Sequence, residues 1–470
     1  MSAADSLSRR PDAAAAVAVQ PHPSTAPRTR SLIRRVLGLA WPVLVENFLQ
    51  TMVGVVDIFM VSFLGTVALA GVGTSLPMLF VIFSAITAVA MGGTVLVARA
   101  VGAKDVRFAG KVAKQTVLLG LGLSVLLTAL GVPLARQLIA LLGPEPEVLD
   151  IGGDYFRITM ATSVGLVMMF VLGAVLRGAG DMRTPMVAGM AMNVINVVLA
   201  YLLIFGNLGF PEMGAVGSAW AAAVARLVGA GGLAVVLWRG RQGVAVRGVL
   251  DWAPHRDTIA RLLRIGVPSM LEQFLMSSSM VVFTAMVIGL GTQVFAAQRI
   301  TFQVLMIGWL PGFAFSIAAT TLVGQSLGAR NPATAERTAW IAVWAAVIVL
   351  IGFGLVFFAL APQITSLFST DTMIVQLGGD SMRLMSLSLP VFGFSIVLQG
   401  ALRGAGDTQF PMYTTGILSW LFRLPLIWVV GILLDRGLLG MYGVFIVESG
   451  IRGIVTYIRF HSGGWKTRVV

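Results

Sequence analysis

The hexapeptide LRGAGD stands at residues 176–181 and again at residues 402–407, which is 226 residues further along the chain. The same offset relates other landmarks, most of them prolines and glycines. These are Pro42 and Pro268, Glu46 and Glu272, Gly65-Thr66 and Gly291-Thr292, Gly102-Ala103 and Gly328-Ala329, and Pro185-Met186 and Pro411-Met412. Chance does not supply a six-residue identity and five further matches in one register, so we predict two copies of one structural unit.

The composition predicts that lipid surrounds most of the protein. Of its 470 residues, 57% are hydrophobic and 11% are charged, whereas a soluble domain carries about 25% charged residues. Twelve long apolar stretches follow one another with short gaps. We predict that they are helices, because a helix satisfies its own backbone polar groups in hydrocarbon and a β-barrel would show weaker, alternating segments.

The twelve stretches divide evenly between the two copies. The predicted spans cover residues 36–62, 68–100, 113–141, 150–176, 184–206, 214–238, 261–290, 295–327, 336–368, 374–402, 410–434 and 439–460. Six is an even number, so both copies enter the membrane the same way up. The predicted fold is an all-α integral membrane protein, with twelve transmembrane helices in two six-helix lobes related by a parallel pseudo-two-fold repeat.

Charge patterning predicts the orientation in the membrane. Lys and Arg gather in the first 35 residues and at every second connection, which predicts that both termini lie in the cytoplasm. We expect the chain to lie in the inner (plasma) membrane of the cell. The net charge of +13 is interpreted as attraction to anionic lipid headgroups, and no nucleic-acid partner is expected. The predicted domains are a disordered cytoplasmic tail (1–31), an N-lobe (32–238), a cytoplasmic linker (239–260), a C-lobe (261–460) and a second cytoplasmic tail (461–470).

The residue inventory leaves little room for catalysis. The chain has no cysteine, and its histidines, His22, His255 and His461, fall outside the predicted spans. We therefore expect no metal centre, no cofactor apart from a coupling ion, and no enzyme. LRGAGD is neither a phosphate loop nor a dinucleotide fingerprint. We interpret it as a cytoplasmic turn whose Arg and Asp cap the backbone or pair locally.

A family resemblance rests on several motifs in one order and spacing. They are Trp41-Pro42-Val43-Leu44-Val45-Glu46-Asn47 with Gln50 and Asp57 after it, both LRGAGD turns, Asn193-Val194-Ile195-Asn196, and Ala296-Ala297-Gln298-Arg299. Over about residues 32–460 the chain resembles the multidrug and toxic compound extrusion (MATE) transporters of the multidrug/oligosaccharidyl-lipid/polysaccharide exporter superfamily. The resemblance implies export of bulky, mostly cationic organic compounds in exchange for protons or sodium.

The candidate ion-coupling residues begin with Asp57. Glu46, Gln50 and Asp57 lie within about 40° of one helical stripe, and a charge inside a membrane is a functional candidate. The resemblance implies a coupling role for Asp57 with Gln50, whereas a carboxylate that only stabilises the bundle is the structural alternative. Asn193 and Asn196 share a helix face and complete this group, with interhelical hydrogen bonding as their alternative role.

Glu272 is the fifth ion-coupling candidate, since family members use an acid in span seven. Some sodium-coupled members carry acids where this chain has Met276 and Ile396, and many members have an aspartate at the position of Ala200. These departures favour protons over sodium. Glu272 is also our predicted partner for Arg423, a cation that should lie deep in the membrane, and Glu448 should pair with Arg452 four residues later.

The candidate substrate-binding residues are one acid and three aromatic side chains. Glu46, Trp309, Phe392 and Trp420 are proposed because aromatic faces and carboxylates attract organic cations. Lipid-facing or core positions are the structural alternative for each aromatic residue. The predicted function is a monomeric secondary antiporter that exports organic cations in exchange for protons, with sodium as the less favoured ion. A lipid-linked-precursor flippase of the same superfamily is the alternative.

Overall fold

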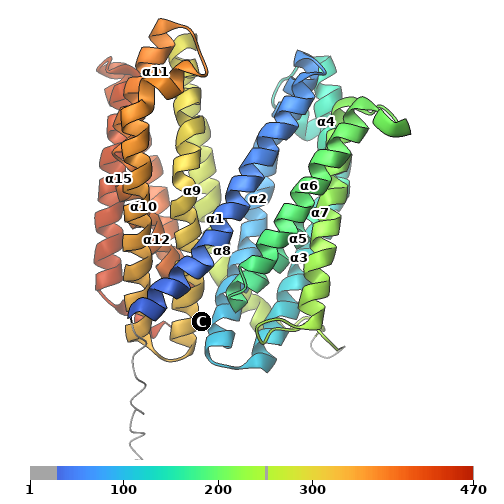
Figure 1. Ribbon diagram of the computed structural model, residues 1–470, viewed down its shortest axis with the longest axis vertical. Helices are drawn as coiled ribbons and strands as arrows, with labels where there is room; N and C mark the ends of the chain where they lie inside the picture. Colours follow the sequence, from blue (N-terminus) through green and yellow to red (C-terminus); the bar gives the residue numbers. More distant parts are fainter. Residues whose placement is uncertain (1–28, 249–251, 469–470) are drawn as a thin grey trace, which may run out of the picture.

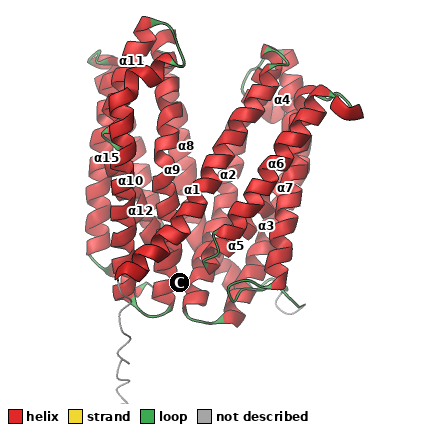
Figure 2. Ribbon diagram, in the orientation of Figure 1, coloured by secondary structure: helices red, strands yellow, loops and turns green. Residues whose placement is uncertain are grey.

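The computed structural model describes residues 29–248 and 252–468, so most of the predicted 1–31 tail lies outside the described residues. The first half contains α1 (Thr29–Ser62), α2 (Thr66–Gly102), α3 (Val106–Ala140), α4 (Pro146–Ala161), α5 (Ser163–Ala179), α6 (Arg183–Phe205), η1 (Asn207–Gly209) and α7 (Gly214–Arg239). The second half contains α8 (Arg256–Ile288), α9 (Thr292–Gly328), α10 (Pro332–Ser366), α11 (Thr372–Ser386), α12 (Leu389–Gly404), α13 (Gln409–Thr415), η2 (Gly416–Arg423), α14 (Leu424–Trp428), η3 (Val429–Leu433), α15 (Gly437–His461) and η4 (Gly464–Thr467). Figure 2 shows these helices and their short connections.

The helices form twelve spans, six in each half. Ten helical segments of the described chain are long and apolar enough to cross a membrane singly, and residues 409–433 form one of these. Two further spans are bent pairs, α4 with α5 at 53° and α11 with α12 at 47°. The bent pairs are the fourth span of each half, so the bend itself is repeated. The predicted all-α, twelve-span fold is confirmed.

Two bundles of helices spread apart at one end of the molecule. In Figure 1 α2 to α7 make one bundle and α9 to α15 the other, with α1 running diagonally between them. α1 packs against α6 of its own half and α9 of the other. α8 does the reverse, packing against α13 of its own half and α2 of the other. The first helix of each half therefore bridges the two lobes.

The lobes meet closely where α2 crosses α9. A side-chain carbon added at Gly102 would lie 2.0 Å from the carbonyl oxygen of Gln325, and one at Gly328 would lie 2.1 Å from that of Arg99. Only glycine permits two backbones to approach so closely. The guanidinium of Arg99 also donates across the junction to the carbonyl oxygen of Ala405 at 2.8 Å. This crossing closes the molecule at the end opposite α4 and α11 (Figure 1).

Candidate functional site

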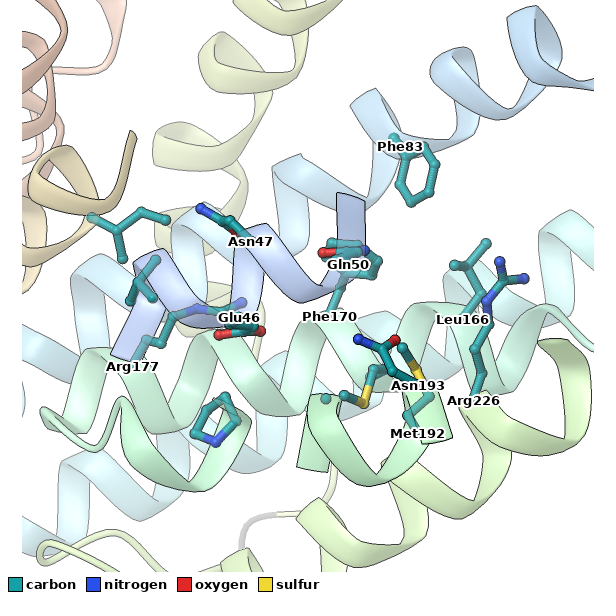
Figure 3. A pocket seen from close by; sticks show the side chains of 15 residues that line it. Glu46, Asn47, Gln50, Phe83, Leu166, Phe170, Arg177, Met192, Asn193 and Arg226 are labelled. Carbon is teal, nitrogen blue, oxygen red and sulfur yellow. The ribbon is translucent and has the colours of Figure 1, made fainter. Parts of the chain in front are cut away.

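A cavity of about 180 Å³ lies inside the N-lobe. It is lined by side chains of α1, α2, α5, α6 and α7, and Ile317 of α9 places it at the border with the other lobe. The polar side chains around it are Glu46, Asn47, Gln50, Arg177, Asn193 and Arg226 (Figure 3). Apolar neighbours include Phe83 and Phe170, whose rings meet edge to face at 5.4 Å. The cavity thus joins charged, amide and aromatic groups within the membrane-spanning region.

Asp57 is bound by an amide beside this cavity. The Nδ2 group of Asn196 on α6 donates to both carboxylate oxygens of Asp57, each at 2.9 Å. Asn196 is buried, and its Oδ1 atom has no hydrogen-bond partner among the described residues. Of the predicted ion-coupling residues, Gln50 and Asn193 face the cavity, while Asp57 and Asn196 bind each other. Four of the five candidates therefore lie on two neighbouring helices, α1 and α6.

The fifth candidate, Glu272, lies in the C-lobe and is paired with an arginine. Arg403 Nη2 lies 2.5 Å from one oxygen of Glu272, and Arg403 Nε lies 3.2 Å from the other. The N-lobe has the equivalent pair, in which Arg177 Nη1 lies 3.3 Å from Glu46. Both arginines belong to the LRGAGD turns, whose arginines we predicted to pair locally. That prediction is wrong, because each guanidinium reaches across to the first helix of its lobe.

The aspartate of the first turn caps the backbone as predicted, whereas that of the second turn pairs with distant arginines, so the prediction of a local role is wrong there. Oδ1 of Asp181 accepts from the backbone N–H of Arg183 at 3.1 Å and of Thr184 at 3.0 Å, capping α6. Its Oδ2 accepts from Arg241 at 2.8 Å. Burial raises the pKa of Asp181, but the bonds from Thr184 and Arg241 outweigh it and hold that pKa below the ordinary value of 3.8. Asp407 instead pairs with Arg459 and Arg468 in the C-terminal region.

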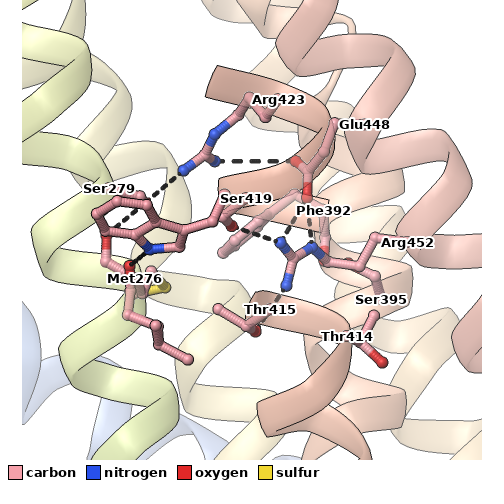
Figure 4. Close-up of polar contacts among 12 residues, drawn as sticks. Met276, Ser279, Phe392, Ser395, Thr414, Thr415, Ser419, Arg423, Glu448 and Arg452 are labelled. Carbon is pink, nitrogen blue, oxygen red and sulfur yellow. Dashed lines mark hydrogen bonds and ion pairs between the residues drawn. The ribbon is translucent and has the colours of Figure 1, made fainter. Parts of the chain in front are cut away.

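A second buried charged group lies inside the C-lobe (Figure 4). Glu448 accepts from Arg452 at 2.9 and 2.5 Å, so the predicted i, i+4 pair is confirmed. Arg423 donates to Ser279 at 2.7 Å and lies 3.9 Å from Glu448. Our prediction that Arg423 pairs with Glu272 is therefore wrong. Spacing along the helices could not reveal that span twelve, rather than span seven, supplies the acid.

The predicted aromatic substrate residues all lie in the C-lobe. The rings of Trp309 and Phe392 are 5.6 Å apart, with Phe302 and Phe313 on either side. Trp420 donates its indole N–H to the carbonyl oxygen of Leu275 at 3.1 Å. None of the three predicted aromatic residues lines the N-lobe cavity, whereas Glu46 does. In the described ranges no three His, Asp or Glu side chains gather as candidate metal ligands.

Twelve spans in two repeated lobes, with charged groups enclosed between the helices, define a membrane transporter. The MatE family model matches residues 42–202 and 268–429, one stretch in each half. The chain belongs to the MatE (MATE) family of membrane transporters. The probable multidrug resistance protein NorM of Thermotoga maritima is 32% identical, covering 93% of this chain and 94% of the relative. The multidrug resistance protein PmpM of Pseudomonas aeruginosa is 26% identical, covering 86% and 85%.

Solved structures agree on the fold. An outward-facing multidrug resistance MATE transporter of the MOP superfamily has a TM-score of 0.86 at 24% identity, covering 93% of this chain and 98% of the other. A MATE structure in a bent conformation has a TM-score of 0.85 at 25% identity, with the same coverage.

Three polar residues of the cavity, Asn47, Arg177 and Arg226, were not among our candidate site residues. Arg226 of α7 is a cation in the middle of a span, and position alone would have identified it as a functional candidate. The arginine partners of Glu46 and Glu272 were also missed, because they come from distant spans.

Proposed function

We propose that this protein is a multidrug efflux antiporter that exports organic cations in exchange for protons, with Asp57 as the coupling acid. The names of two relatives, the probable multidrug resistance protein NorM and the multidrug resistance protein PmpM, support the export of drugs. The observation that carries the choice of Asp57 is its partner. Glu46, Glu272 and Glu448 each pair with an arginine, whereas Asp57 is bound by the neutral amide of Asn196.

This difference matters for proton exchange. An acid that is paired with a buried cation leaves an unbalanced charge when it is protonated, and such a charge costs several kcal/mol in a low dielectric. Asp57 can take up a proton and keep a hydrogen bond to Asn196. Protonation then removes the negative charge that holds a cationic compound, and α1 repacks near Pro42. The proton and the cationic compound compete for the carboxylate of Asp57, so the compound binds the ionised form more tightly than the protonated form. This difference in affinity couples the two movements.

The remaining features of the proposal follow from charge patterning. We propose a monomer in the inner membrane, with both termini in the cytoplasm and with the coupling ion as its sole cofactor. The gathering of Lys and Arg at alternate connections supports this orientation. Sodium stays the alternative coupling ion.

Transport in proteoliposomes tests the coupling residue. Wild-type protein should move ethidium when a pH gradient is imposed, and ethidium should in turn drive proton movement. Asp57→Asn should abolish both, while the matched change Asp154→Asn, at an exposed carboxylate of α4, should leave both intact. Normal proton-coupled exchange by Asp57→Asn, or transport driven by a sodium gradient alone, would overturn the proposal.

A further inference from the structure

Arg226 is a cation in the middle of a membrane span. It lies twelve residues after the start of α7 and thirteen before its end, so its backbone is about 18 Å from either end of the helix. The side chain lines the N-lobe cavity (Figure 3). In the parts of the chain that the structure describes, its guanidinium makes no hydrogen bond and no ion pair within 4.0 Å. Asp57 lies near enough for the two charges to attract each other, but it does not occupy the N–H donors of the guanidinium. The cost of a charge at that depth, with donors left unused, points to a ligand.

The second half of the chain shows what an arginine at this position binds. The repeat offset of 226 places Arg452 of α15 at the position of Arg226. Glycines confirm the register, since Gly214 and Gly217 of α7 correspond to Gly440 and Gly443 of α15. Arg452 binds the carboxylate of Glu448 through Nε at 2.9 Å and Nη2 at 2.5 Å. The residue that corresponds to Glu448 in the N-lobe is Ala222.

The two lobes therefore have an arginine at the same position, but only the C-lobe has an acid four residues before it. Where the C-lobe holds the carboxylate of Glu448 (Figure 4), the N-lobe has a methyl group at Ala222 and an open cavity of about 180 Å³ beside Arg226. Arginine is suited to this task, because its planar fork matches a carboxylate in two parallel hydrogen bonds. The pair of Glu448 and Arg452 thus shows how a carboxylate binds an arginine at this position of the repeat.

We propose that Arg226 binds a carboxylate of the transported compound, so that the N-lobe cavity is a subsite for carboxylate-bearing zwitterions. The cavity has room for a carboxylate and an attached ring, and Phe83 and Phe170 provide an aromatic wall. The amides of Gln50 and Asn193 also line the cavity and can donate hydrogen bonds to the same carboxylate. The cationic end of the compound then lies toward Asp57, which is why this inference rests on the proposed function and narrows its substrate class.

Binding of a matched dye pair tests the subsite. Tetramethylrhodamine is a zwitterion with a free carboxylate, and its methyl ester is a cation of nearly the same shape. Their affinities for purified protein in detergent are measured by fluorescence polarisation, without any ion gradient. Arg226→Gln should weaken the zwitterion by about tenfold or more, as expected for losing charge-assisted hydrogen bonds, and should leave the ester bound as before or more tightly. Arg239→Gln, at an exposed arginine of the same helix, is the matched control and should change neither.

A second variant supplies the missing acid. Ala222→Glu should recreate the C-lobe pair, occupy Arg226 from within, and abolish the preference for the zwitterion over its ester. Thermal unfolding identifies variants that fail to fold, and if Ala222→Glu is one of them, the affinity ratio in Arg226→Gln and Arg226→Lys decides. Equal losses for both dyes in Arg226→Gln, or an unchanged ratio, would overturn the inference. The binding assay uses no ion gradient, so its result does not depend on the transport test of Asp57→Asn. A loss of zwitterion preference in Arg226→Gln supports the subsite even if Asp57→Asn retains proton exchange.

Discussion

Glu46 of α1 and Arg177 of α5 form an ion pair at 3.3 Å, and the second half of the chain repeats it between Glu272 of α8 and Arg403 of α12 at 2.5 Å. Each acid follows a proline by four residues, at Pro42 and Pro268. Each pair therefore ties the bridging helix of its lobe, just beyond the proline, to the helix that ends in LRGAGD. α1 and α8 are held to their own lobes here, although residues nearer their starts, such as Val36 and Ile265, pack in the core of the opposite lobe.

The two pairs should differ in strength. The carboxyl side chain of Glu272 is 9% exposed and binds Arg403 through two nitrogens, whereas that of Glu46 is 17% exposed and its Oε2 has no partner among the described residues. Arg403→Met should destabilise the protein by a few kcal/mol, up to the ~3–5 kcal/mol of a fully buried pair, and Arg177→Met by less. Unfolding in detergent measures both. Adding Glu272→Gln to Arg403→Met should recover part of the loss, and the reverse ranking would contradict this account.

The acid of the C-lobe network should matter more than either of its cations. Glu448→Gln leaves Arg423 and Arg452 close together without a counter-charge, which should cost roughly 3–5 kcal/mol or prevent folding. Arg423→Met keeps the bidentate pair of Glu448 and Arg452, and should cost clearly less. Expression level and unfolding midpoint compare the two variants. Equal effects of the two variants on the unfolding midpoint would contradict this ranking.

The close crossing of α2 and α9 should set the separation of the lobes. Gly102→Ala puts a methyl group 2.0 Å from the carbonyl oxygen of Gln325, so the helices must part at the closed end. Gly73→Ala in the same helix meets no atom within 4 Å and should be neutral or slightly stabilising, since alanine favours helix over glycine.

Spin labels at the open end measure the result. The chain has no native cysteine, so labels attach only at Leu141→Cys and Leu367→Cys, two exposed positions at the ends of α3 and α10. Parting of the helices at the crossing should shorten the distance between these labels in Gly102→Ala. An unchanged distance distribution would mean that the crossing does not control the opening.

The cap of α6 should make stability depend on acid pH. Because the pKa of Asp181 is lowered in the folded protein, its ionised form contributes stability above the unfolded value, near 3.8, and this contribution is lost as pH falls through the folded pKa. Asp181→Asn should therefore lower the unfolding midpoint at pH 7, and the difference from wild type should vanish at pH values below the folded pKa. A difference that stays constant with pH would mean that the carboxylate charge contributes nothing.

Sequence alone predicted the parts of this protein that repeat. Apolar length identified the spans, and the 226-residue offset identified the two lobes. The sequence could not predict which charged residues pair across the bundle. The rotation of one helix against another decides that Arg177 meets Glu46 and that Arg423 meets Glu448. The meaning of Arg226 also needed the structure, since only there does Arg452 stand with its acid and Arg226 beside an open cavity.

The glycine crossing has a consequence for the origin of the chain. Gly102 approaches Gln325 as Gly328 approaches Arg99, and these four residues are related in pairs by the same 226-residue offset. Such a self-complementary contact is isologous, the kind that two identical subunits make across a dyad. The chain thus has the architecture of a fused homodimer. Fusion freed each half to diverge. The second half now has Glu448 four residues before its arginine, whereas the first has Ala222 at that position.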